Sequence, residues 1–194
     1  MAMSITTFIV LGLLVLAAGY GVILYNNLVA LKHRVAKAWS NIDVLLKQRH
    51  DELPKLVDTC RQYMTYEQDT LEKVIRARGH VSQAREEGDV AALGSAETEL
   101  RAGLGRLFAL AEEYPDLKAN ESFQHLQARI SDLENAIADR RELYNDAVNL
   151  NNIRIEQFPD VLVARLFGFR DFELLEFSEE EIADVNVKSL FNAG

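Results

Sequence analysis

The 194-residue sequence is poor in cysteine, proline and glycine, with one, three and ten respectively. The single cysteine, Cys60, cannot form an internal disulfide, and its apolar helical position favours a core residue over a reactive thiol. So few prolines and glycines argue against disorder, collagen-like repeats and an all-β fold with many turns. Basic residues are also scarce, since 21 Lys and Arg stand against 30 Asp and Glu for a net charge of -9. We therefore expect an all-α protein with no nucleic-acid partner, because nucleic-acid binding depends on Lys and Arg displacing counterions.

The first 31 residues contain no Asp, Glu, Lys or Arg. Within them, residues 5–24 form an almost wholly apolar run, which as a helix would cross the roughly 30 Å hydrocarbon core of a bilayer. A cleaved signal peptide is the alternative, but it would have a basic start and a shorter apolar core. We predict a short N-terminal end over residues 1–4 and a single transmembrane helix over residues 5–24, followed by apolar sequence to residue 31.

Basic residues follow the apolar run but do not precede it. By the positive-inside rule, the N-terminus faces out and the large C-terminal part lies in the cytoplasm. Tyr20 and Tyr25 bracket the lower end of the span, as aromatic membrane anchors would. The basic residues that set this orientation are Lys32, Arg34, Lys37, Lys47 and Arg49.

Apolar residues recur at steps of three and four after the span, which predicts that its helix continues into the soluble part. This stripe comprises Leu28, Leu31, Val35, Ala38, Ile42 and Leu45. Two successive steps of four through Arg49 form a stutter before the pattern resumes at Leu53. Because Pro54 lacks a backbone donor, we expect a kink or a helix break near residues 49–53, either as a rigid bend or as a functional hinge. The resumed helix should end near Gly88.

Two further amphipathic helices follow. One should begin at about Asp89 and stop at Tyr114-Pro115, and the other should be capped by Asn120 and end before Pro159. Three helices, or four if Pro54 separates two arms, would bury their apolar stripes in an antiparallel bundle over residues 25–169. Three glycines weaken the helix after residue 89, which indicates either close packing or an exposed turn; they are Gly94, Gly103 and Gly105.

Residues 170–194 form a short, irregular tail rich in acids and aromatics, preceded by one short helix over residues 161–169. Ser178 and Glu181 fit a capping box, and residues 185–187 alternate like a brief strand. The tail either folds back over the bundle or docks on a neighbouring subunit or partner protein. The aromatic residues that would serve assembly are Phe167, Phe169, Phe172 and Phe177.

Ordered motifs along most of the chain resemble the LemA family of bacterial membrane-anchored proteins. The resemblance implies a single N-terminal membrane helix, an antiparallel helical bundle, a bacterial inner-membrane location, and no assigned catalytic residue or cofactor. The motifs that carry it are Tyr25-Asn26 with Leu28-Val29, Ala38-Trp39 with Ile42-Asp43-Val44 and Leu46-Lys47, Asp51 with Leu53-Pro54 and Leu56-Val57, Arg106-Leu107-Phe108, the run from Tyr114 to Glu121 with Phe123, Tyr144-Asn145 with Ala147-Val148, Phe158-Pro159 and Phe167-Gly168-Phe169.

Several polar and aromatic residues lie beside the apolar stripes of the first and third helices. They either form a polar network in the core that fixes the helix register, or line a groove for a peptide or small ligand. Arg140, Arg141, Glu134 and Glu142 look like solvated helix charges. The candidate network or groove residues are Trp39, Asn41, Asp43, Tyr144, Asn145 and Asn151, with Pro54 as the bend.

No residue set indicates catalysis, and none of the four histidines has a partner at metal-ligand spacing. We therefore predict a non-enzymatic protein without cofactor or metal that acts through protein–protein interaction. It would be a self-assembling scaffold, as a homo-oligomer, or an accessory of a membrane protein complex. The alternative is a membrane-anchored sensor that captures a peptide or small ligand between its helices.

Overall fold

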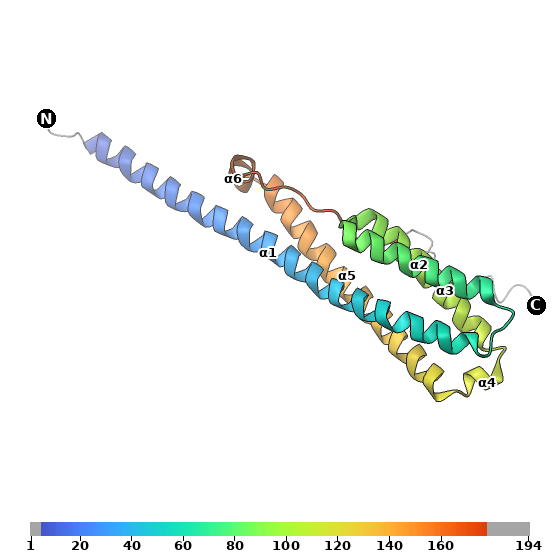
Figure 1. The fold of residues 1–194 in the computed structure, drawn as a ribbon. Coiled ribbons are helices and arrows are strands. Elements are labelled where there is room, and N and C mark those ends of the chain that lie inside the picture. Colours follow the sequence, from blue (N-terminus) through green and yellow to red (C-terminus); the bar gives the residue numbers. More distant parts are fainter. Residues whose placement is uncertain (1–4, 178–194) are drawn as a thin grey trace, which may run out of the picture. The chain divides into compact units, whose positions relative to one another are not determined.

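The computed structural model describes residues 5–177, which contain six helices and no strand (Figure 1). The predicted all-α fold is therefore confirmed. The proposed capping box at Ser178 and the brief strand at residues 185–187 lie outside the described residues. The helices are α1 (Ile5–Arg61), α2 (Gln68–Glu87), α3 (Val90–Ala111), α4 (Pro115–Lys118), α5 (Glu121–Glu156) and α6 (Asp160–Phe167).

The described residues divide into two compact units. Unit 1 contains residues 5–41 and 142–173, and unit 2 contains residues 42–141 and 174–177. Unit 1 therefore holds the first part of α1, the last part of α5 and all of α6, whereas unit 2 holds the rest of α1 and of α5 together with α2, α3 and α4.

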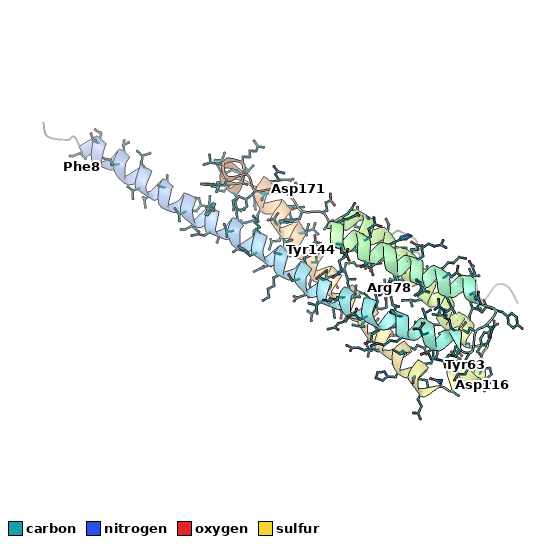
Figure 2. The ribbon with its side chains drawn as sticks, in the orientation of Figure 1. Phe8, Tyr63, Arg78, Asp116, Tyr144 and Asp171 are labelled. Atoms are coloured by element: carbon teal, nitrogen blue, oxygen red, sulfur yellow. The ribbon has the colours of Figure 1, made fainter. Side chains whose placement is uncertain are left out.

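The first part of α1 is apolar and exposed, and it is long enough to cross a membrane. Figure 2 shows Phe8 in this part, pointing away from the helix axis. Burial begins at Leu24 and Leu28, whose side chains are enclosed within unit 1. The apolar run and the packed part belong to one helix of 57 residues, as the stripe predicts.

The expected helix break near Pro54 is wrong, because α1 continues through this proline to Arg61. Leu53, Leu56 and Val57 are all buried around it, and the packing of an amphipathic face gives more helical stability than backbone propensity does. The chain turns instead at residues 62–67, inside a stretch that was expected to be helical as far as Gly88.

The prediction of a stutter in the apolar stripe at Arg49 is also wrong. Leu46 is buried and Arg49 is itself a buried stripe residue, so the alternation of steps runs without interruption from Ile42 to Leu53. The two successive steps of four through Arg49 appear only if Leu45 is counted in place of the buried Leu46.

Caps at the other helix ends agree with the sequence patterns. Gly88 takes the left-handed conformation after α2, with φ of 71°, and the Ala92 N–H donates to Asp89 Oδ1 at 2.8 Å. The Phe123 N–H donates to Asn120 Oδ1 at 3.0 Å at the start of α5. The two-residue connection at Gly88 and Asp89 makes α2 and α3 antiparallel neighbours, which Figure 1 shows in green.

Candidate functional site

Unit 2 contains a buried cluster of charges. Arg49 on α1 forms ion pairs with Glu97 on α3 and Glu134 on α5, and the side chains of Arg49 and Glu97 are each 1% exposed. Arg101 Nε donates to the second oxygen of Glu134 at 2.8 Å. Three helices that are distant in the sequence are therefore joined by one guanidinium group.

The environment of this cluster alters the pKa of both fully buried members. Burial opposes the positive charge of Arg49, but the carboxylates of Glu97 and Glu134 outweigh that effect and raise the pKa of the guanidinium. Burial raises the pKa of the Glu97 carboxyl, and the contact with Arg49 opposes this shift. The three groups are held by each other, so the cluster has a structural role in unit 2.

Sequence reasoning missed this cluster. Glu134 and Arg141 were interpreted as solvated helix charges, which is wrong for Glu134 because two arginines enclose it. Arg141 lies with its guanidinium carbon 3.9 Å from the ring centre of Phe177, so it is not simply solvated either. The sequence does contain a signal for this cluster, because Arg49 and Glu97 each occupy a position in an apolar stripe, where a charged residue must be buried.

In unit 1, two of the predicted polar and aromatic residues come together. The rings of Trp39 on α1 and Tyr144 on α5 lie 5.4 Å apart between centres, and the Tyr144 hydroxyl donates to the Glu173 carbonyl at 2.9 Å. Burial, with a smaller contribution from the negative charge of Glu173, raises the pKa of Tyr144. The two rings therefore contact each other between α1 and α5.

Amides near the end of α5 hold the start of the tail. Asn151 Nδ2 donates to the Arg170 carbonyl at 3.3 Å. Asn152 binds Phe172 twice, donating to its carbonyl at 2.9 Å and accepting from its N–H at 3.0 Å. The predicted core amide Asn151 is therefore buried against the tail.

The remaining predicted site residues lie apart from this group. Asn41 is exposed and lines a hollow of about 350 Å³ in unit 1. Asp43 accepts from Arg85 at 3.1 Å in unit 2. Asn145 is half-buried on α5, and Pro54 lies inside α1.

Three of the aromatic residues predicted for assembly make contacts within the chain, although Phe167 is still 59% exposed. Phe167 and Phe169 lie 4.7 Å and 5.8 Å from the ring of Tyr25, between ring centres. Tyr25 is thus part of an aromatic cluster and not an isolated membrane anchor. In unit 2, Phe177 lies under Arg141 and within 5.3 Å of Arg101.

An open cleft of about 610 Å³ lies beside these rings in unit 1, and we call it the aromatic cleft. Its polar groups are mostly cationic, from Lys32 and Arg170, with Asp171 as the acid. Figure 2 labels Asp171 at the start of the tail. The residues that line the cleft are Tyr25, Val29, Lys32, His33, Asn151, Phe167, Gly168, Phe169, Arg170, Asp171 and Phe172.

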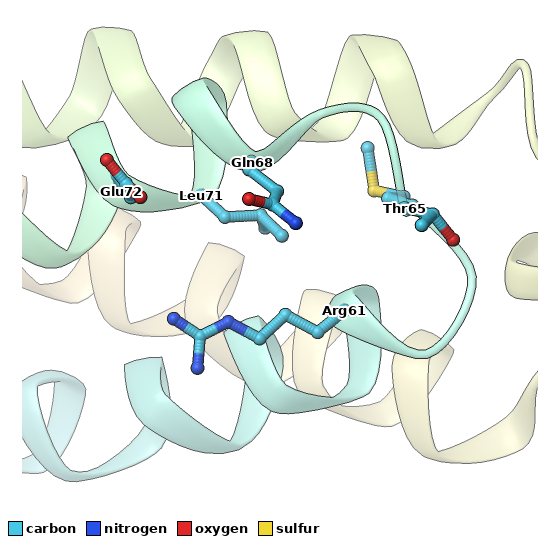
Figure 3. A pocket seen from close by; sticks show the side chains of 6 residues that line it. Arg61, Thr65, Gln68, Leu71 and Glu72 are labelled. Atoms are coloured by element: carbon cyan, nitrogen blue, oxygen red, sulfur yellow. The ribbon is translucent and has the colours of Figure 1, made fainter.

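A second hollow, of about 350 Å³, lies in unit 2 at the turn between α1 and α2 (Figure 3). Its wall combines polar side chains, including Arg61, Gln68 and Glu72, with the apolar Met64 and Leu71. Among the described residues, no group of three His, Cys, Asp or Glu side chains could hold a metal ion. Of these hollows, the aromatic cleft combines the largest volume with a wall of rigid rings.

Comparison with known proteins identifies relatives of this chain. The sequence profile of the LemA family matches residues 38–189. Magnetosome protein MamQ 2 of Paramagnetospirillum magneticum is 26% identical over 186 residues, covering 84% of this chain and 68% of the relative. Magnetosome protein MamQ of Magnetospirillum gryphiswaldense is 24% identical over the same length and with the same coverage. Protein LemA of Metamycoplasma hominis is 28% identical over 167 residues, covering 86% of this chain and 75% of the relative.

Proposed function

Because this chain belongs to the LemA family, we propose that it is a membrane-anchored helical bundle that acts by binding other proteins. It serves as a self-assembling scaffold or as an accessory of a membrane protein complex. The observation that carries this proposal is the continuity of α1. One helix begins as an exposed apolar run that can cross a bilayer and continues as a packed element of the folded part.

Three side chains that could act as acid, base or nucleophile are buried in the core instead, which supports binding over catalysis. Arg49 and Glu97 are enclosed in mutual ion pairs. Cys60 is fully buried, and burial raises the pKa of its thiol to about 12, so the nucleophilic thiolate is suppressed.

The aromatic cleft is the surface we assign to partner binding. Exposed aromatic rings with arginine at their edge are typical of the residues that contribute most to protein interfaces. Phe167 is well exposed, and Arg170 lies three residues further along the cleft wall. With the N-terminus outside the cytoplasm, as Lys32 and Arg34 favour, the cleft faces the cytoplasmic side of the bacterial inner membrane.

Photo-crosslinking in native membranes tests the proposal. A photoreactive phenylalanine analogue replaces Asp171, which is exposed at the cleft, or Asn149, an exposed α5 residue that does not line it. We expect a defined crosslinked product from position 171 and none from position 149. A product containing only this chain identifies a scaffold, and one containing another protein identifies an accessory. Equal labelling at both positions, or none at either, would contradict the proposal.

A second function, capture of a peptide or small ligand by a membrane-anchored sensor, is favoured by the volume of the aromatic cleft. A sensor would have to transmit binding along α1, through Pro54. Substituting Pro54→Ala separates the two functions. A scaffold should keep its crosslinking pattern in this variant, whereas a sensor should lose its response to the ligand.

A further inference from the structure

The apolar face of α6 points outward, opposite to what a helix in a water-soluble protein shows. Within α6, Leu162 and Leu166 are four residues apart and are 61% and 78% exposed, and Phe158, in the turn before the helix, is 75% exposed. Phe167, at the end of the helix, is 59% exposed. Large apolar side chains at helical spacing and turned outward together mark a surface that contacts something other than water.

The two fully buried residues of α6 are a polar one and a small one. Asp160 and Ala164 are buried, and Arg154 Nη2 lies 3.4 Å from Asp160 Oδ1. The helix is held in unit 1 by this ion pair, by Ala164 and by the contact of Phe167 with Tyr25, while Leu162 and Leu166 remain largely exposed. This orientation is fixed by local contacts and leaves the apolar face available.

α6 lies where the apolar run of α1 ends. The ring of Phe167 is 4.7 Å from that of Tyr25, which directly follows the last residue of the apolar run at Leu24. The headgroup layer on each side of a bilayer is about 5–7 Å thick, so a group this close to the end of a span lies within that layer.

α6 also runs across α1. In Figure 1 α6 is seen nearly end-on, while the neighbouring part of α1 in unit 1 runs along the page. A helix lying across a transmembrane segment lies along the membrane surface, which is the geometry of an interfacial amphipathic helix. Tyr20, Val22 and Ile23, at the end of the apolar run of α1, are exposed as well.

We propose that the occupant of this face is the lipid bilayer, and that Leu162 and Leu166 of α6, with Phe158 of the turn before it, insert between the headgroups of the leaflet in which α1 ends. Arg165 and Arg170 are exposed beside this face, and guanidinium groups at this level reach lipid phosphates. The inserted helix gives unit 1 a second membrane contact beside the span. This inference rests on the proposed membrane anchoring by α1.

Spin labelling of the full chain tests the proposal. The buried Cys60, with a pKa of about 12, resists labelling, so a nitroxide can be attached to an introduced cysteine in an otherwise native protein. The label is placed at Leu162→Cys, or at Leu166→Cys as a second variant should the first fail to fold. The protein is reconstituted in phosphatidylcholine vesicles with and without phosphatidylglycerol, and collisions of the label with oxygen and with a water-soluble nickel chelate are compared.

Two reference positions separate the outcomes. Ile9→Cys lies in the apolar run, and Asn149→Cys lies on the exposed surface of α5. We expect position 162 to lose nickel collisions and gain oxygen collisions, as position 9 does, while position 149 shows the reverse. Phosphatidylglycerol should strengthen the effect through the arginines.

Each other result overturns a specific statement. Nickel access at position 162 with lipid access at position 9 refutes insertion of α6 and leaves the anchoring intact. Nickel access at position 9 refutes the anchoring itself. Loss of both collision partners at position 162 shows that a protein surface, and not lipid, covers the face.

Discussion

Replacing Arg49 by methionine tests whether the buried charge cluster stabilises unit 2. Methionine retains much of the side-chain length but leaves Glu97, which is 1% exposed, without its cationic partner. Removing one member of a buried ion pair costs about 3–5 kcal/mol, because the other charge stays in a poorly solvating environment. We expect a loss of about 3 kcal/mol, at the lower end of this range, in the free energy of unfolding at neutral pH.

The loss has a ceiling that depends on pH, because the carboxyl left behind can take a proton. The ordinary pKa of Glu97 is 4.5. Each unit of pH above that value adds about 1.36 kcal/mol to the free energy needed to protonate the carboxyl. The destabilisation caused by the unpaired charge can therefore reach about 3.4 kcal/mol at pH 7 but only about 0.7 kcal/mol at pH 5.

The sign of this dependence follows from proton linkage. Burial raises the folded-state pKa of Glu97, and removal of the guanidinium raises it further. The folded variant then binds more protons than the unfolded chain, so its stability is highest below the unfolded pKa and falls as the pH rises towards the folded pKa.

Urea unfolding of the full chain in detergent micelles, followed by far-UV circular dichroism at about pH 5 and about pH 7, measures both effects. Arg106→Met, on the exposed side of α3, is the matched control and should change stability by less than about 0.5 kcal/mol. The double variant Arg49→Met with Glu97→Met should recover most of the loss, since neither buried charge remains. The reasoning is refuted if Arg49→Met matches the wild type at pH 7, or if its deficit does not shrink at pH 5.

Three further changes test local packing. Gly94→Ala should lower the stability by about 1–3 kcal/mol and with it the melting temperature, because the new Cβ would lie 2.0 Å from the carbonyl oxygen of Glu176 in the tail. Gly105→Ala should raise the melting temperature, because a Cβ there would have nothing within 4 Å. Cys60 should react with a thiol reagent at pH 8 only in urea, since a pKa of about 12 leaves about one thiolate in ten thousand. Asn152→Ala should cost about 1 kcal/mol and accelerate hydrogen exchange at the Phe172 amide, which mass spectrometry can follow.

Local signals in the sequence were sufficient for much of the fold. The apolar run that begins α1 is long and uncharged, and the caps at Asp89 and Asn120 depend on a side chain three residues from the N–H it accepts. Such features are decided within one or two turns of a helix, so a single sequence contains the information needed to predict them.

The errors arose where distant residues decide the structure. The turn at residues 62–67 is flanked by apolar residues at helical spacing, and the stripe alone cannot distinguish a turn from a continuing helix. Met64 is buried within this turn, and Asn120 donates to the Tyr63 hydroxyl at 3.1 Å from far along the chain. Arg49 was misread for a similar reason, because its two carboxylate partners come from other helices.

Two phenylalanines near the end of the described chain differ in burial. Phe177 is buried under two arginines of unit 2, whereas Phe167 stays exposed beside α1 in unit 1. Their immediate neighbours do not predict this outcome, since the exposed Phe167 follows Leu166 whereas the buried Phe177 follows Glu176. Whether each ring is buried depends on what surrounds the folded segment.

The buried charges of unit 2 and the exposed leucines of unit 1 indicate that the two units are surrounded by different solvents. Unit 2 encloses charges and pairs them, which is what a domain surrounded by water does when it must hold an arginine in its core. Unit 1 exposes Leu162 and Leu166, whose transfer out of water would release roughly 1.5–3 kcal/mol each on full burial. A water-soluble fold would gain this transfer free energy by turning the leucines of α6 inward. At a membrane surface the same free energy is gained with the leucines facing outward into lipid. The orientation of α6 is therefore the one that a membrane surface favours.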